Sequence, residues 1–311
     1  MNPRLHTLLF GLIICTGAPI GVAQTAEPVA ITQVKDPAPP APIDPALGTL
    51  LDKIEAADAT LVWLNAPIRL IRRFPEIQGG GEHTRYGTIW YAAEPKAKPT
   101  PNQPTPNQPS LPAPPLRRFA LGFDTLDIKG GVNLQAVRRE DKQAFVFDGT
   151  WLLETREAEK FFIRRRIVAP GVIKDPVRIG EGPFPLPVGQ RKADMLARFD
   201  VTTPDPLQNA PENPRLRELL STCVQLRLVP KVDTPGARDF QEIRLWYRKA
   251  DLMPIYAQTI NLDASSAEVF IVLQESWDKP FDTGVFSTVP PKAEDGWKGD
   301  VIEQVQGQAK P

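Results

Sequence analysis

Cysteine and histidine are scarce in this sequence, whose 311 residues include two of each. Cys15 lies in an N-terminal apolar run, so a chain cleaved after that run keeps only Cys223, which excludes an internal disulfide and a cysteine-rich metal site. His83 stands in a polar, glycine-rich stretch, where we expect a structural role. No His-x-x-x-His or Cys pair has the spacing of a zinc site. We therefore expect no metal and no cofactor.

Catalytic signatures are also missing. No Ser stands in a nucleophile elbow, and glycines 79–81 and 130–131 lie between predicted strands instead of before a helix, where a phosphate loop would need them. Asp124, Asp127 and Asp148 fall at predicted turns, where Asp commonly serves the backbone. A pair of carboxylates for glycoside hydrolysis stays open, although nothing favours it. We expect a protein that is not an enzyme.

An excess of either charge is absent too, because 37 Lys and Arg balance 37 Asp and Glu. Without a basic field, nucleic acid is not an expected partner. Proline is abundant instead: the 35 Pro exceed the roughly 5% usual in globular proteins. Many of them gather in 24–45 and in 96–115, which contains a tandem PTPNQ repeat. We interpret the first stretch as a spacer and the second as a loop insertion, with a partner-binding or wall-crossing role as the alternative.

The first residues predict an export signal. Leu8 to Ile14 forms an apolar core too short to span a bilayer, and small residues precede a cleavage site after Ala23. Residues 1–23 are therefore predicted to be a cleaved signal peptide and the mature chain to be periplasmic. The alternative is a lipoprotein signal ending at Cys15, where Ile14 occupies a position that needs a small residue.

The stretch 144–168 predicts paired antiparallel strands. Asp148-Gly149 is a strong turn signal, because Gly accepts positive φ and Asp tolerates it. Alternation with period two then predicts one apolar face and one mixed face. The apolar face would hold Phe145, Phe147, Trp151, Leu153, Phe161, Ile163 and Ile167. Arg165 falls among them, so we expect a bulge that turns Arg164–Arg166 outward or an arginine stem that snorkels at the sheet edge. The alternative is that Arg165 lies at the mouth of a cavity.

The remaining pattern predicts an α+β fold with one antiparallel sheet of about nine to eleven strands and three helices. An amphipathic helix over 46–65 should end before Pro67, and two short helices follow at 190–199 and 214–223. Further strands are predicted at 68–76, 84–93, 116–128, 132–140, 224–230, 240–248, 254–263 and 267–275. Three helices cover one apolar sheet face only in part, which would leave a groove for an apolar ligand. The alternative is an ordinary α+β core that these helices seal.

Several short motifs, in this order, resemble those of a known family. They are YGTIW (Tyr86 to Trp90), FDGTWLLE, DMLARFDV, LRLVPK and the strand pair from Phe240 to Asp263. Together they are similar to LolA, the periplasmic outer-membrane lipoprotein carrier family, over residues 46–275. The resemblance implies an unclosed eleven-stranded half-barrel with a helical lid, which holds acyl chains. An Arg-Pro pair that helps latch the lid in that family is replaced here by Glu94-Pro95.

The resemblance implies a half-barrel domain over 46–290 with a polar tail over 291–311. As a carrier, the chain would shield the acyl chains of a lipid or lipoprotein, work as a monomer and meet transfer partners at the inner or outer membrane. The expected cavity residues are Trp90, Phe119, Leu121, Phe123, Phe145, Phe147, Trp151, Phe161, Ile163, Leu245 and Tyr247, with Arg165 at the mouth. The alternatives are an envelope signalling or scaffold module with the same fold, and a hydrolase on an unrelated sheet.

The export signal predicts a defined N-terminus. Intact-mass measurement of the protein from its own envelope should give a chain that begins at Gln24 without added lipid. A diacylglyceryl group on Cys15 would instead assign the lipoprotein signal and a membrane anchor.

Overall fold

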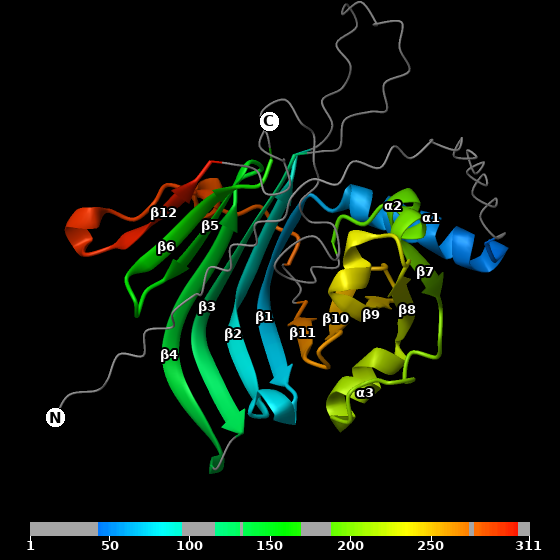
Figure 1. Cartoon of the computed structure of the whole chain (residues 1–311). Helices are drawn as coiled ribbons and strands as arrows, with labels where there is room; N and C mark the ends of the chain where they lie inside the picture. The colour runs from blue at the N-terminus through cyan, green and yellow to red at the C-terminus, as the bar shows by residue number, and fades with distance from the viewer. Residues whose placement is uncertain (1–42, 95–115, 131–132, 169–187, 274–276, 304–311) are drawn as a thin grey trace, which may run out of the picture. The chain divides into compact units, whose positions relative to one another are not determined.

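The computed structural model describes residues 43–94, 116–130, 133–168, 188–273 and 277–303 (Figure 1). The signal peptide, the insertion 96–115 and nearly all of the spacer lie outside these residues, so they stay predictions. Within the described ranges, no helix combines the length and the apolar character needed to cross a membrane.

The first helix, α1, spans Pro45–Thr60. Asp44 caps it by accepting a hydrogen bond from the Ala46 N–H at 2.9 Å, and Pro45 needs no N–H in the first turn. The helix ends at Thr60 and not at Asn65, because the chain is already extended at Leu61. The prediction that Pro67 ends the helix is also wrong, since Pro67 lies within a strand, opposite Thr88.

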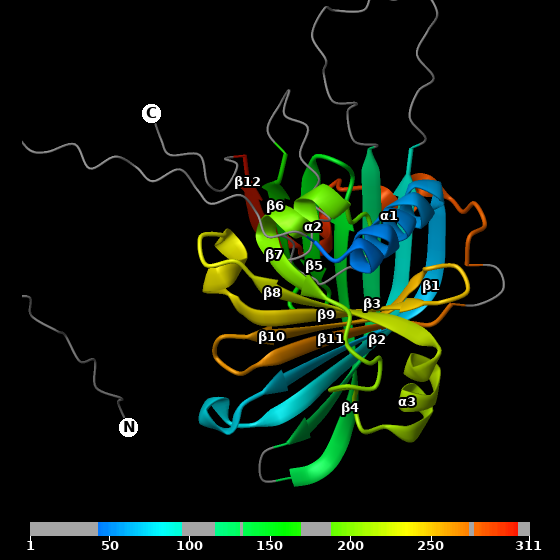
Figure 2. The same cartoon turned by 90° about the vertical axis from the view of Figure 1, so that its right-hand side faces the viewer.

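Two short helices lie where the sequence predicts them. They are α2 (Lys192–Arg198) and α3 (Pro214–Ser221). Asn213 caps α3 by accepting a hydrogen bond from the Leu216 N–H at 3.1 Å, and Pro214 occupies its first turn. Helices α1 and α2 lie side by side (Figures 1 and 2).

The strands form one open, twelve-stranded sheet with the order β12-β6-β5-β4-β3-β2-β1-β11-β10-β9-β8-β7. Every pair is antiparallel except β6 with β12, and the terminal strands β12 and β7 do not close on each other. The predicted fold class, an unclosed antiparallel sheet with helical cover, is confirmed. The strands are β1 (Trp63–Phe74), β2 (Gly81–Ala93), β3 (Arg117–Gly130), β4 (Asn133–Phe147), β5 (Trp151–Arg156), β6 (Phe161–Arg166), β7 (Phe199–Thr202), β8 (Cys223–Pro230), β9 (Phe240–Arg248), β10 (Pro254–Asn261), β11 (Ser266–Ile271) and β12 (Lys298–Ile302).

Two strands are absent from the prediction. Strand β7 follows α2 directly, and β12 lies in the stretch predicted as a polar tail. All five residues of β12 are exposed, so no apolar alternation marks it in the sequence, and backbone pairing with β6 alone defines it.

One face of the sheet, which we call the lid face, lies under α1 and α2. Its first cluster extends over β1 to β5 and β11 and contains Leu64, Ile89, Leu121, Phe147 and Ile271 among others. Its second cluster packs Leu51 and Ile54 of α1 and Met195 of α2 against β8, β9 and β10. The amphipathic stripe predicted for the first helix therefore lies on apolar strands, as expected.

The opposite face, which we call the outer face, is also apolar. Helix α3 covers Cys223, Trp246 and Tyr256 through Leu216 and Leu220. Near the other end of the sheet, Phe286 packs on Ala120, Val146 and Leu153. The prediction of a sheet with a single apolar side is therefore wrong, because α3 and the segment around Phe286 each cover an apolar part of the outer face.

The hairpin between β4 and β5 places Trp151 and Leu153 on the face opposite to the predicted one. Phe147 pairs with Leu152 and Val146 with Leu153, so Trp151 and Leu153 lie on the face opposite Phe145 and Phe147. The Asp148 side chain holds the turn by accepting hydrogen bonds from the Thr150 and Trp151 N–H groups, each at 2.8 Å. A shift of one residue in the register of a hairpin moves every side chain of the second strand to the other face.

Gly87 marks the closest approach between β2 and β3. The register of this pair shifts between Tyr86 and Gly87, and a Cβ added at Gly87 would lie 1.8 Å from the carbonyl oxygen of Gly122. A Cβ at Gly122 would meet only the Trp90 ring, at 3.3 Å. Backbone cannot yield as a side chain can, so Gly is required at 87.

This difference gives a matched pair of substitutions. Gly87→Ala should lower the free energy of unfolding by about 1–3 kcal/mol or more, because the strands must separate to admit the methyl group. Gly122→Ala should cost clearly less, since the Trp90 ring can shift. Denaturant unfolding measures both, and equal losses would contradict the assignment of the close approach.

Candidate functional site

Five of the predicted cavity residues come together on the lid face. They are Phe119, Leu121, Phe123, Phe145 and Phe147, all in the first lid-face cluster. Phe147 exposes only 1% of its surface and contacts the Phe119 ring with centroids 5.6 Å apart. These five side chains are therefore packed in a buried cluster and do not line an open groove.

Leu245 and Tyr247 also lie on the lid face, in the second cluster below α1. Burial is the main reason why the pKa of the Tyr247 hydroxyl is raised, and the nearby Asp58 carboxylate adds to it. The hydroxyl therefore stays protonated at neutral pH. The strict alternation of β9 predicted both residues on one face, and the register confirms that placement.

Phe161, Ile163 and Arg165 share the lid face by register, because Arg165 pairs with Leu152. All three are half-buried and lie outside the two lid-face clusters. The pairing of β5 with β6 has no register shift, so the predicted bulge at Arg164–Arg166 is wrong. Arg164 and Arg166 simply alternate to the outer face.

Trp90 and Trp151 are the two predicted cavity residues that lie elsewhere. Trp90 packs in the outer-face cluster with Ala92 and Phe286. Trp151 contacts the guanidinium groups of Arg164 and Arg166, also on the outer face. The prediction that both line a shared cavity with the lid-face residues is wrong, because each is adjacent in its strand to a lid-face residue and therefore points to the opposite face.

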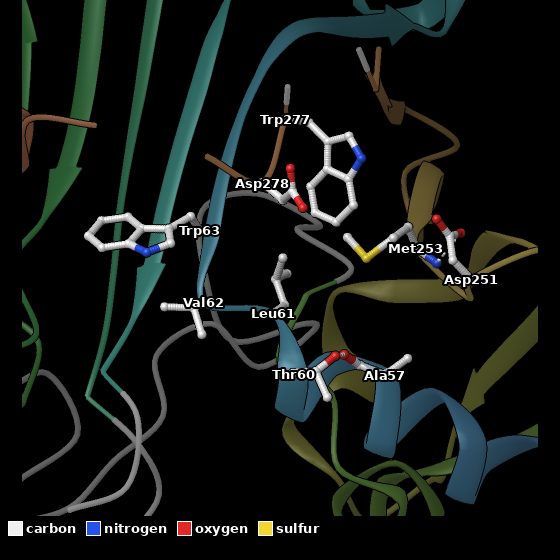
Figure 3. A pocket seen from close by; sticks show the side chains of 9 residues that line it. All are labelled: Ala57, Thr60, Leu61, Val62, Trp63, Asp251, Met253, Trp277 and Asp278. Carbon is white, nitrogen blue, oxygen red and sulfur yellow. Dashed lines mark hydrogen bonds between the residues drawn. The ribbon is translucent and has the colours of Figure 1, made fainter. Parts of the chain in front are cut away.

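A pocket of about 270 Å³ opens at the end of α1 (Figure 3). It lies where α1 meets the start of β1, beside the loop between β9 and β10. Its walls are Ala57, Thr60, Leu61, Val62, Trp63, Asp251, Met253, Trp277 and Asp278. The Asn65 N–H fixes one wall by donating to the Trp277 carbonyl oxygen at 2.7 Å.

The pocket is continuous with the lid-face core. Leu61, Met253 and Trp277 line the pocket and also pack in or against the first lid-face cluster. Figure 3 shows these three side chains around one space, with Trp63 pointing away. A cavity of only about 10 Å³ lies on the other side of Leu61, under α1, which is room for about one water. The space therefore ends where α1 touches the sheet.

Asp251 and Asp278 supply the carboxylates at the pocket. Burial alone raises the pKa of Asp251, but hydrogen bonds from Arg248 and from the Met253 N–H bring it below its ordinary value. The Arg248 Nε donates to Asp251 Oδ1 at 2.9 Å, so this charge is balanced. Asp278 is exposed. The pocket thus has apolar depth and a polar entrance.

A buried ion pair holds α1 to the sheet next to this pocket. Arg117, at the start of β3, places its Nη2 3.1 Å from Asp58 Oδ2 of α1, and its Nη1 donates to the Gly189 carbonyl oxygen at 2.6 Å. Asp58 Oδ1 in turn accepts from the Gly189 N–H at 2.5 Å. Gly189 has φ +80, and a Cβ there would lie 2.2 Å from the Arg117 guanidinium. We call this arrangement the latch.

The sequence pattern contains a signal for the latch that was not recognised. Period-two alternation places Arg117 on the same face as Phe119, Leu121 and Phe123. It is thus an arginine on an apolar strand face, as Arg165 is. The resemblance directed attention to Glu94 instead, which lies 3.4 Å from Arg118 and away from the helices. The latch arginine comes from the start of β3 and not from the end of β2.

His83 and Cys223 have no link to the pocket. Burial, followed by Arg85, Arg139 and Arg72, lowers the pKa of His83, which lies in β2 against the Phe74 ring and not in a turn. Burial raises the pKa of the Cys223 thiol, the first residue of β8. Among the residues that the structure describes, no group of three or more His, Cys, Asp and Glu could hold a metal ion.

Comparisons with known proteins give structural neighbours only. No protein-family model matches the chain, and no curated protein matches it. The chain is similar to an uncharacterized conserved protein from Thermus thermophilus (10% identity, 83% of this chain and 99% of that one, TM-score 0.31). It is also similar to a DUF1329 family protein from Desulfovibrio piger (13%, 76% and 98%, 0.30) and a LolA superfamily protein from Nitrosomonas europaea (9%, 77% and 96%, 0.28).

These neighbours include the superfamily that the sequence motifs resemble. The fold described above rests on this chain's own strand register and packing.

The latch predicts that two Asp→Asn substitutions in α1 lower the stability of the protein by very different amounts. Asp58→Asn leaves Arg117, which is 8% exposed, without its carboxylate and should cost about 3–5 kcal/mol of stability. Asp52→Asn removes an ion pair with Lys192 whose carboxylate is 64% exposed, and should cost less than about 1 kcal/mol. Chemical denaturation measures both variants, and similar losses would show that the latch adds nothing beyond a surface pair.

Proposed function

We propose that this protein is a periplasmic carrier that binds an acyl chain of a lipid or lipoprotein on its lid face, with the end of α1 as the entrance. The observation that carries the proposal is the continuity between the pocket and the core: Leu61, Met253 and Trp277 belong to both. A chain that enters the pocket meets the largest apolar cluster of the described residues once these three side chains move. The role is binding and transfer, and not catalysis.

The size of the pocket sets how far the lid must open. About 270 Å³ is slightly below the roughly 300–1,000 Å³ of pockets that bury a small ligand. The pocket as it stands holds only the end of an acyl chain. Deeper insertion requires Leu61 and the end of α1 to leave the sheet, and α1 is held there by the latch.

The free energy gained by burying an acyl chain is large enough to offset the cost of moving α1 away from the sheet. Each methylene moved from water into an apolar site contributes roughly 0.8 kcal/mol, so about ten methylenes contribute about 8 kcal/mol. Opening the lid lets both partners of the latch return to water together, and it exposes Leu51 and Ile54 of α1 at roughly 1.5–3 kcal/mol each. An acyl chain of ordinary length therefore offsets the opening of the lid, whereas a ligand with only a few methylenes does not. The protein should select long apolar chains.

Location follows from the predicted signal peptide and not from the fold. If residues 1–23 direct export, the carrier works between two membranes, where a lipid anchor must be shielded from water. Native mass spectrometry of protein taken from its own envelope addresses the ligand directly. A bound lipid or acylated protein supports the carrier, whereas a protein partner without lipid would favour a scaffold.

A pair of neighbouring substitutions tests the entrance. Thr60 lines the pocket, and Ala59 is equally exposed on the same helix turn but does not line it. Thr60→Trp should narrow the entrance and weaken binding of an acylated peptide at least about tenfold, which corresponds to about 1.4 kcal/mol. Ala59→Trp places the same indole side chain outside the pocket and should leave affinity unchanged.

The measurement is a titration with a fluorescent acylated peptide, with thermal unfolding of both variants as the control for folding. Equal affinity in Thr60→Trp, Ala59→Trp and the unmodified protein would remove the entrance from the proposal. If none of the three binds the peptide, the carrier function itself is wrong.

A further inference from the structure

Three consecutive arginines, Arg164 to Arg166, end strand β6, and two of them share one partner. Arg164 and Arg166 both point to the outer face, where their guanidinium carbons lie 4.1 Å and 4.7 Å from the centre of the Trp151 ring. Arg166 is the direct cross-strand neighbour of Trp151, and Arg164 lies two residues along the strand. We propose that Arg164 and Arg166 form a binding site for a phosphate group.

Two cations beside one ring repel each other unless an anion lies nearby. In the part of the chain that the structure describes, neither Arg164 nor Arg166 makes an ion pair with a carboxylate. Attraction to the indole ring stabilises each of them but does not cancel their charge. The pair therefore keeps two positive charges for a ligand.

One hydrogen-bond donor of each arginine is also unused. The Nε atoms of Arg164 and Arg166 are both buried and have no acceptor among the described residues. A guanidinium that lies over an aromatic ring keeps its N–H donors in its own plane, directed past the ring edge. Because Arg164 and Arg166 lie on the same face of β6, two residues apart and over the same ring, donors of both can reach the oxygens of one phosphate.

One acid on the same hairpin, Asp148, holds the turn beside the Trp151 ring. Asp148 precedes the turn that leads to Trp151, and its Oδ1 accepts the Thr150 and Trp151 N–H groups at 2.8 Å each. Its other oxygen accepts a hydrogen bond from the Thr288 hydroxyl. Asp148 thus fixes the position of Trp151, and in the described structure it makes no ion pair with Arg164 or Arg166. Glu303, which follows β12, is exposed and makes no ion pair in the described structure.

A phosphate fits this site better than a carboxylate would. Phosphate carries more charge and more acceptor oxygens, and Arg binds it with two donors at once. The same chemistry occurs in a free phosphate ester and in the headgroup of an anionic phospholipid. The site lies on the outer face, away from the pocket, so this inference does not depend on the carrier function.

Arg165 provides a matched control. It has the same side chain on the same strand, is also half-buried and also lacks an ion pair among the described residues, but it points to the lid face. Arg164→Gln, Arg166→Gln and Arg165→Gln each remove one charge within three consecutive positions. Only the first two should affect the phosphate site.

Calorimetric titration of the full chain with inorganic phosphate is the first experiment. Arg164→Gln and Arg166→Gln should each weaken binding about tenfold, and Arg165→Gln should not change it. The second experiment measures how much protein sediments with phosphatidylglycerol vesicles and with phosphatidylcholine vesicles. The ratio of the two amounts removes the contribution of general affinity for a bilayer. Loss of about fivefold in the preference for phosphatidylglycerol in the same two variants would identify a lipid headgroup as the source.

Each outcome is decisive. Phosphate binding that depends on Arg164 and Arg166, without an effect on vesicles, identifies a soluble phosphate ester. A vesicle effect without binding of free phosphate identifies a headgroup presented on a surface. Equal losses in Arg165→Gln would reduce the effect to general charge and overturn the site, as would the absence of both kinds of binding in the unmodified protein. Thermal unfolding of all three variants confirms that they are folded.

Discussion

The sheet is apolar on both faces, and the rest of the structure follows from the need to cover both. Apolar surface left in water costs about 25 cal/mol per Å², so neither face is left bare over its central strands. Helices α1 and α2 cover the lid face, and α3 with the segment around Phe286 covers the outer face. An open sheet cannot bury its own surface as a closed barrel does, so these covers are attached from outside and each can in principle be detached.

The two covers are attached by different means. Phe281, Val285 and Phe286 hold the C-terminal segment mainly by apolar packing, with Phe281 edge-on to Trp63 at 5.1 Å. A hydrogen bond from the Thr288 hydroxyl to Asp148 and the Arg118 guanidinium over the Phe286 ring add to this packing. Helix α1 combines apolar packing with the latch, in which Arg117, Asp58 and Gly189 satisfy one another. A buried ion pair adds little net stability but is specific in geometry, so it fixes one closed position. That makes α1 the cover suited to open and close again.

The candidate site was only partly predictable. Period-two alternation correctly grouped Phe119, Leu121 and Phe123, and Phe145 with Phe147, because each group lies within one strand. It failed across the turn, where the Asp148 loop reversed the parity and moved Trp151 to the outer face. The pocket escaped it altogether, because Leu61, Met253 and Trp277 are far apart in sequence and meet only through the register of β1, β10 and β11.

The sequence by itself determined the local structure: helices where apolar residues recur every three or four positions, strands where they alternate, and turns at Asp148-Gly149 and at the glycines of 79–81. These features depend on neighbours along the chain, so local chemistry suffices. The tertiary structure alone decided which faces are covered, where α1 stops, and that exposed residues 298–302 pair with β6 as a twelfth strand. It also decided that Arg117 meets a carboxylate while Arg164 and Arg166 share an indole ring. Such pairings depend on register and on packing between distant segments, which no local pattern contains.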